Sequence, residues 1–103
     1  MIWIISGTQD GREIGAALAD REQSKPEGER REILMTVVSQ YGKVLAAHKG
    51  LDIEVGRFRE EDMLRVIKEK GISLILDASH PYAAIVSETA RAACTKAGID
   101  YVR

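Results

Sequence analysis

Short apolar runs alternate along this chain with longer segments in which apolar residues recur every three or four positions. The apolar runs predict five strands, over residues 1–5, 33–38, 51–55, 72–76 and 99–103. The segments between them predict helices over residues 10–22, 41–48 and 60–70, and a last helix that ends near residue 97. The first strand shows no polar alternation, which is typical of a strand buried on both faces of a parallel sheet.

Strands that alternate with helices predict an α/β protein with right-handed crossovers. We therefore expect a doubly wound, Rossmann-like parallel sheet of five strands in the order 3-2-1-4-5, with residues 1–103 forming one domain. The last predicted strand stands at the end of the sequence. This position predicts a fragment or one domain of a longer protein.

The residues at the helix ends support these boundaries. Asp10 is the expected N-cap of the first helix, and the later helices are expected to end at Gly50, Gly71 and Gly98. Within the first helix, helical spacing predicts a stripe made of Ile14, Ala17, Leu18 and Arg21.

Composition narrows the classes of function. The chain has 103 residues, 45% hydrophobic and 30% charged, which indicates one globular domain. A net charge of −1 provides no basic field, so we expect no nucleic-acid partner. No apolar run approaches the ~20 residues that span a bilayer, so we expect no membrane association. The single cysteine, Cys94, excludes an internal disulfide, fits a cytoplasmic protein and is expected in the core; with two histidines we expect no metal site.

The first predicted strand leads into a turn with glycine at every fourth position, beginning with Gly7 and Gly11. A strand that ends in glycines and opens into a helix often holds a phosphate, because the unpaired N–H groups of the first helical turn point at the anion. The spacing is not G-x-G-x-x-G, so a tight turn without a ligand stays open as the alternative. Arg12 is either a bidentate phosphate ligand or a surface arginine paired with Asp10 or Glu13.

In a sheet of this order, ligands bind at the carboxyl ends of the strands, near the switch point between the first and fourth strands. Three predicted loops meet there, over residues 6–12, 39–42 and 77–82. Ser39 and Gln40, followed by Lys43, stand where NAD-binding domains usually carry an acidic residue, and this favours NADP. The alternative is that Ser39 and Gln40 only shape a turn.

The loop after the fourth strand contains Asp77, Ser79 and His80, which are the residue types of a hydrolytic triad. We reject a triad because residues this close on one loop rarely form the required nucleophile–base–orienter line. Pro81 favours the first turn of a helix, with Ser79 or His80 as its cap. The alternative is a loop that lines a nicotinamide pocket.

Three segments resemble the precorrin-6A reductases of cobalamin biosynthesis, in family order and over nearly all of the chain. Residues 4–13 (IISGTQDGRE) resemble the family's opening strand and Gly-Gly-Thr-x-Asp-Gly-Arg-type turn, with Ser6 in place of the first glycine. Residues 36–42 (TVVSQYG) resemble its second signature. Residues 77–83 (DASHPYA) resemble its third, in which His-Pro-Tyr directly follows a buried strand.

The resemblance implies an NADPH-dependent reductase that transfers a hydride to a carbon–carbon double bond of the tetrapyrrole precorrin-6A, or of its cobalt-containing counterpart, giving the 6B form. It implies that this chain is the N-terminal half of a longer two-domain enzyme, and that the half alone binds NADPH weakly and does not turn over substrate. By resemblance, the cofactor-binding residues would be Gly7, Thr8, Asp10, Gly11, Arg12, Ser39, Gln40, Tyr41, Ala78 and Ser79. His80 and Tyr82 would lie where cofactor and substrate meet, as candidate proton donors.

Two other interpretations stay open. The first is a flavodoxin-like binding or regulatory module without catalysis, which predicts acidic residues clustered at the ends of the first and third strands. Only Asp10 and Asp77 lie near the strand ends at this edge of the predicted sheet. The second is the NADP-binding half of a reductase from another pathway, since nothing in composition or spacing points to a tetrapyrrole.

Overall fold

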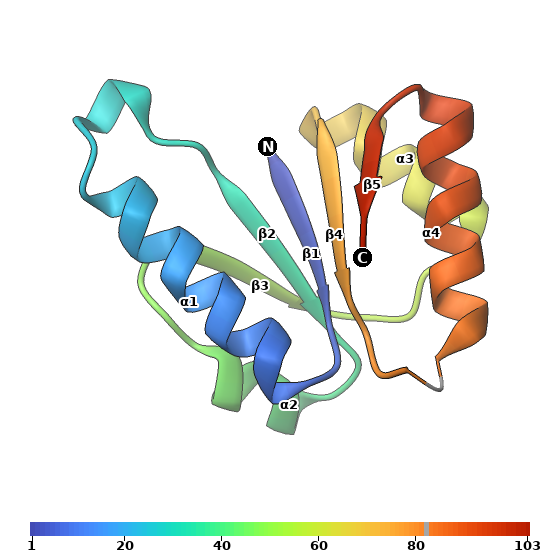
Figure 1. The fold of residues 1–103 in the computed structure, drawn as a ribbon, viewed down its shortest axis with the longest axis horizontal. Coiled ribbons are helices and arrows are strands. Elements are labelled where there is room, and N and C mark those ends of the chain that lie inside the picture. The colour runs from blue at the N-terminus through green and yellow to red at the C-terminus, as the bar shows by residue number, and fades with distance from the viewer. Residues whose placement is uncertain (82) are drawn as a thin grey trace.

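The computed structural model describes residues 1–81 and 83–103 and confirms the alternation of strands and helices (Figure 1). The strands are β1 (Ile2–Ser6), β2 (Ile33–Val37), β3 (Leu51–Val55), β4 (Leu74–Ala78) and β5 (Asp100–Val102). The helices are α1 (Gln9–Gln23), α2 (Gln40–Ala46), α3 (Glu60–Lys70) and α4 (Ala84–Ala97), with a short 3-10 helix η1 (Glu27–Glu29) before β2.

The sheet has the predicted order, β3-β2-β1-β4-β5, and every pair of neighbouring strands is parallel. Helices α1 and α2 lie on one face and α3 and α4 on the other, as Figure 1 shows. The crossovers from β1 therefore wind in one direction toward β3, and the chain then returns to place β4 on the other side of β1. This arrangement creates the expected switch point between β1 and β4.

Strand β1 is central because its side chains enter both halves of the core. Trp3 and Ile5 pack in the cluster beneath α3 and α4, whereas Ile2 and Ile4 pack in the cluster beneath α1 and α2. Trp3 is completely buried, and its Nε1–H donates a 2.9 Å hydrogen bond to Thr36 Oγ1 on β2. The ring's one polar group is thus satisfied, and its faces are free to pack against apolar neighbours.

Helix α1 packs on the sheet with a face that the apolar stripe did not predict. Its buried residues are Gly11, Gly15, Ala19 and Glu22, while Ile14 is 46% exposed. A Cβ at Gly11 would lie 2.9 Å from both Ala78 Cβ and Ser6 Oγ, and one at Gly15 would lie 2.2 Å from Met35 Cε. The helix approaches the sheet so closely that two glycines and an alanine form most of its contact face, whereas the predicted stripe placed Ile14 there.

Several element ends also differ from the prediction. The N-cap of α1 is Thr8 rather than Asp10, because Thr8 Oγ1 accepts the N–H of Gly11 at 3.0 Å. Strand β4 continues two residues further than expected, to Ala78, and α2 ends at Ala46, well before Gly50. The predicted C-caps of α3 and α4, Gly71 and Gly98, are confirmed, each in a left-handed conformation.

Replacing Gly11 with alanine should lower the free energy of unfolding by about 1–3 kcal/mol, because the added methyl group collides with Ala78 Cβ on β4 and with Ser6 Oγ. Gly28→Ala is the matched control, since no atom lies within 4 Å of its added Cβ, and it should change stability by less than about 0.5 kcal/mol. Urea unfolding measures both. Equal stability of the two variants would contradict the close packing of α1.

Candidate functional site

The turn after β1 and the loop after β4 touch at the carboxyl edge of the sheet. The N–H of Gly7 donates to the carbonyl of Ala78 at 3.2 Å, and Thr8 Oγ1 donates to the same carbonyl at 3.2 Å. A Cβ on Gly7 would lie 3.2 Å from the backbone nitrogen of His80. The structure therefore brings together residues from two of the three loops in which the sequence predicted a ligand site.

Two cavities open at this edge, one on each side of the ends of β1 and β2. The first, which we call the α1-side cavity, has a volume of about 220 Å³ and lies between the β1–α1 and β2–α2 turns. Its lining includes Gly7, Arg12, Ser39 and Tyr41, all of which the family resemblance implied as cofactor-binding residues. The third predicted loop thus joins the same region from the other side of β1.

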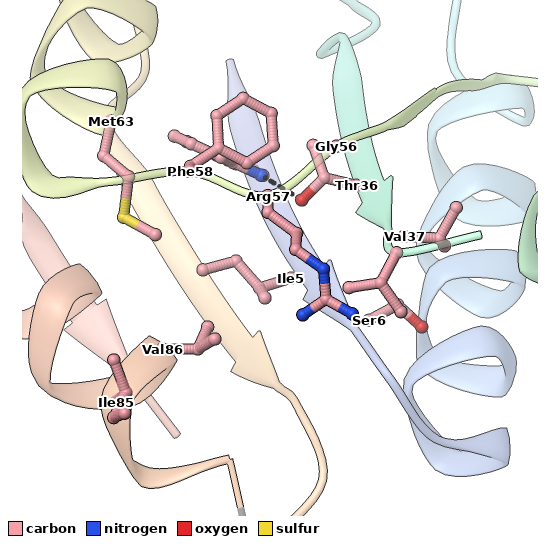
Figure 2. Close-up of a pocket in the computed structure, with 12 residues that line it drawn as sticks. Ile5, Ser6, Thr36, Val37, Gly56, Arg57, Phe58, Met63, Ile85 and Val86 are labelled. Atoms are coloured by element: carbon pink, nitrogen blue, oxygen red, sulfur yellow. Dashed lines mark hydrogen bonds between the residues drawn. The ribbon is translucent and has the colours of Figure 1, made fainter.

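The second, which we call the α3-side cavity, has a volume of about 210 Å³ and lies beneath the loop that joins β3 to α3 (Figure 2). Its walls are mostly apolar and include Trp3, Ile5 and Phe58. The two cavities share Ser6, Val37 and Val38 in their linings. They are therefore neighbours across the ends of β1 and β2.

Arg12 lies on the first turn of α1, is partly buried, and lines the α1-side cavity. No carboxylate of residues 1–81 and 83–103 lies within ion-pair distance of its guanidinium. Glu13 instead accepts a 3.1 Å hydrogen bond from Gln9 Nε2. The alternative that Arg12 is paired with Asp10 or Glu13 is therefore wrong.

The predicted cofactor residues differ in whether their polar groups face a cavity. The hydroxyl of Ser39 accepts the N–H of Gly42 at 3.0 Å and caps α2, so this residue shapes a turn as well as facing the cavity. Gly11 is buried, and its N–H is bonded to Thr8. Asp10 and Gln40 are exposed and line neither cavity.

The β4–α4 loop carries the two candidate proton donors. His80 is exposed on this loop beside the Gly7 turn, and Tyr82 lies outside the described residues. The expected capping of a helix by Ser79 or His80 is wrong, because α4 begins at Ala84 with Ala83 as its N-cap. Pro81 thus precedes the helix instead of entering its first turn.

Asp77 is a buried carboxylate that joins three segments of the chain. Its side chain has no exposed surface. One oxygen accepts the N–H of Ser79 at 3.0 Å, and the other accepts the hydroxyls of Ser87 and Tyr101, each at 2.6 Å. Arg103 completes the set with a 3.2 Å ion pair. The network ties the start of the β4–α4 loop to α4 and to β5.

Electrostatics keep this carboxylate charged. Burial by itself raises the pKa of Asp77, but the hydrogen bonds from Ser79, Ser87 and Tyr101 outweigh burial and lower the pKa from 3.8 to about 2. Burial, together with the hydrogen bond to Asp77, raises the pKa of the Tyr101 hydroxyl. The sequence pattern did not predict this network. An acid at the end of an apolar strand is the signal that a buried partner exists, but the partners are distant in sequence.

Cys94 is 2% exposed and lies in the core, as predicted. Within the described residues, no group of three or more histidine, cysteine or carboxylate side chains is arranged to hold a metal ion. No helix in the described part of the chain combines the length and apolarity needed to cross a bilayer.

A doubly wound parallel sheet with two adjoining cavities at the carboxyl ends of β1 and β2 defines this chain as an α/β protein with a candidate ligand site at that edge. A model of the family described as precorrin-6x reductase CbiJ/CobK matches residues 1–103. The chain belongs to this family.

Curated relatives agree with that assignment, and a solved structure shares the fold. The chain is 32% identical to a cobalt-precorrin-6A reductase of Priestia megaterium, covering 100% of this chain and 37% of the relative. It is 30% identical to a cobalt-precorrin-6A reductase of Synechocystis, covering 99% of this chain and 36% of the relative. A CobK precorrin-6A reductase structure shares the fold with a TM-score of 0.79 at 24% identity, over 97% of this chain and 36% of that one. The chain thus spans about a third of the length of the curated relatives it matches.

Asp77→Asn should lower the free energy of unfolding at pH 7 by about 2–4 kcal/mol, because Arg103 and two hydroxyls lose a charged acceptor in a buried site. The folded-state pKa lies below the unfolded value of 3.8, so the stabilisation is complete above that value and is lost as the pH falls toward 2. Urea unfolding at pH 7 and near pH 2 measures both effects.

The control is Asp52→Asn, which changes an exposed carboxylate on β3 and should alter stability by less than about 0.5 kcal/mol. Asp77→Asn could instead destabilise the chain equally at pH 7 and near pH 2. That result would show that the charge of Asp77 does not contribute to stability.

Proposed function

We propose that this chain is the NADPH-binding part of an enzyme that reduces precorrin-6A, or cobalt-precorrin-6A, to the 6B form in cobalamin biosynthesis. Membership of the CbiJ/CobK family supports the pathway, and the names of the relatives support the substrate class. The observation that carries the cofactor assignment is the pair of adjoining cavities at the carboxyl ends of β1 and β2. One of them is lined by Arg12, which forms no ion pair with any of the described residues.

The residues around the α1-side cavity suit a dinucleotide. Arg12 offers a guanidinium for a phosphate, and Gly7 leaves the backbone accessible because it has no side chain. Ser39 Oγ is the acceptor in the hydrogen bond that caps α2, with the N–H of Gly42 as donor. Its own O–H proton is therefore available to donate to a phosphate or a ribose hydroxyl. Tyr41, 73% exposed, adds an aromatic face. Asp10, Gly11, Gln40, Ala78 and Ser79 then shape the surrounding turns.

NADPH, when bound, supplies a hydride to one carbon of the substrate double bond, and the neighbouring carbon takes a proton. The β4–α4 loop lies beside the phosphate-binding turn, so a substrate next to the cofactor would meet His80 there. A histidine side chain is a common general acid in such a position. The chain's other contribution is orientation, since Asp77 holds the start of this loop through Ser79.

The substrate cleft needs more than these residues. The curated relatives are much longer than this chain, and we propose that their remaining parts close over the tetrapyrrole. The 103-residue chain should therefore bind NADPH without reducing precorrin-6A, which anaerobic incubation and product absorbance would test. Turnover by the 103-residue chain alone would overturn this division of labour.

Arg12→Ala should weaken NADPH binding roughly tenfold or more, because a charge-assisted contact to phosphate is lost. Arg21→Ala, in the exposed last turn of the same helix, removes the same charge away from the cavity and should leave the dissociation constant unchanged. Nicotinamide fluorescence measures both. Equal effects of the two substitutions would mean that only net charge matters, and no binding by the unaltered chain would favour a non-catalytic module.

A further inference from the structure

The α3-side cavity is an apolar slot with one cationic side chain at its edge. Trp3, Ile5 and Met63 form its inner wall, and Phe58 meets Trp3 edge to face with ring centroids 5.4 Å apart. The indole N–H is already bonded to Thr36, so no polar group of that ring points into the space. Flat aromatic groups bind well between such walls.

Arg57 comes from the loop between β3 and α3 and lies across this slot. Figure 2 shows its guanidinium reaching from the loop toward Ser6 and Val37, at the ends of β1 and β2. Arg57 is exposed, and it makes no ion pair with any residue in 1–81 or 83–103. A cation is thus available at the point where the two cavities meet.

We propose that the α3-side cavity takes the adenine ring of the dinucleotide, and that Arg57 binds the 2′-phosphate and so selects NADPH over NADH. This inference rests on the proposed function and adds to it a residue that sets cofactor specificity. A cofactor that crosses the ends of β1 and β2 places its diphosphate beside Arg12 and its adenosine beside Arg57, because the two cavities share Ser6 and Val37.

The volume of the α3-side cavity favours the adenine ring as its occupant. A volume of about 210 Å³ admits a purine base but not a tetrapyrrole macrocycle. Arginine at the edge matches the geometry of a phosphate with two parallel hydrogen bonds. Sequence alone pointed to Lys43 as the nearby cation, but Lys43 lines neither cavity.

The test uses two ligands that lack nicotinamide, adenosine 2′,5′-bisphosphate and adenosine 5′-monophosphate, with binding to the 103-residue chain measured by calorimetry. The unaltered chain should prefer the bisphosphate. Arg57→Ala should reduce that preference by roughly 10- to 100-fold and leave the affinity for the monophosphate unchanged. Lys43→Ala, the matched control, should keep the preference.

Trp3 is the only tryptophan in the chain and lines the slot, so its fluorescence reports where the base binds. Both nucleotides should change its emission. Binding without an emission change would overturn the adenine assignment. An unchanged preference for the bisphosphate in Arg57→Ala would overturn the role of Arg57. If Arg12→Ala weakened the binding of both ligands in that case, the proposed function would still hold. No binding of either nucleotide would overturn the proposed function together with this inference.

Discussion

The close approach of α1 to the sheet is the constraint on which the site depends. Glycine at positions 11 and 15 lets the helix lie against β1 and its neighbours without displacing Met35 or Ala78. That contact brings the β1–α1 turn to β4, where Gly7 and Thr8 both bond to the carbonyl of Ala78. A larger residue at position 11 would separate the turn from the loop that it must meet.

A second constraint acts from the opposite side of β1. The buried charge of Asp77 is stable only while donors from three segments surround it, so α4, β5 and the β4–α4 loop are held in one arrangement. Between these two fixed elements, the ends of β1 and β2 border both cavities. The proposed cofactor path thus runs over the ends of the central strand β1 and its neighbour β2 and uses side chains from the adjoining turns and loops.

The strand order was predictable because alternating apolar runs and helices leave few arrangements of a parallel sheet, and β1 is apolar on both faces. The face of α1 that packs on the sheet was not predictable, because glycine carries no hydrophobic signal even where it makes the closest contact. Arg12 and Ser39 could be predicted as ligand-binding residues because each closely follows a predicted strand. Arg57 lies in a loop with no sequence motif, and only the cavity beneath it indicates a role. The Asp77 network was hidden because its partners lie 10, 24 and 26 residues further along the chain.

The central claim is that NADPH binds across the carboxyl ends of β1 and β2, and mapping backbone amide chemical shifts during an NADPH titration tests it most directly. The account predicts that the largest changes fall in the β1–α1 turn, the β2–α2 turn and the β3–α3 loop, which supply Gly7, Ser39 and Arg57. Changes concentrated at the amino ends of the strands, or no changes at saturating NADPH, would contradict it.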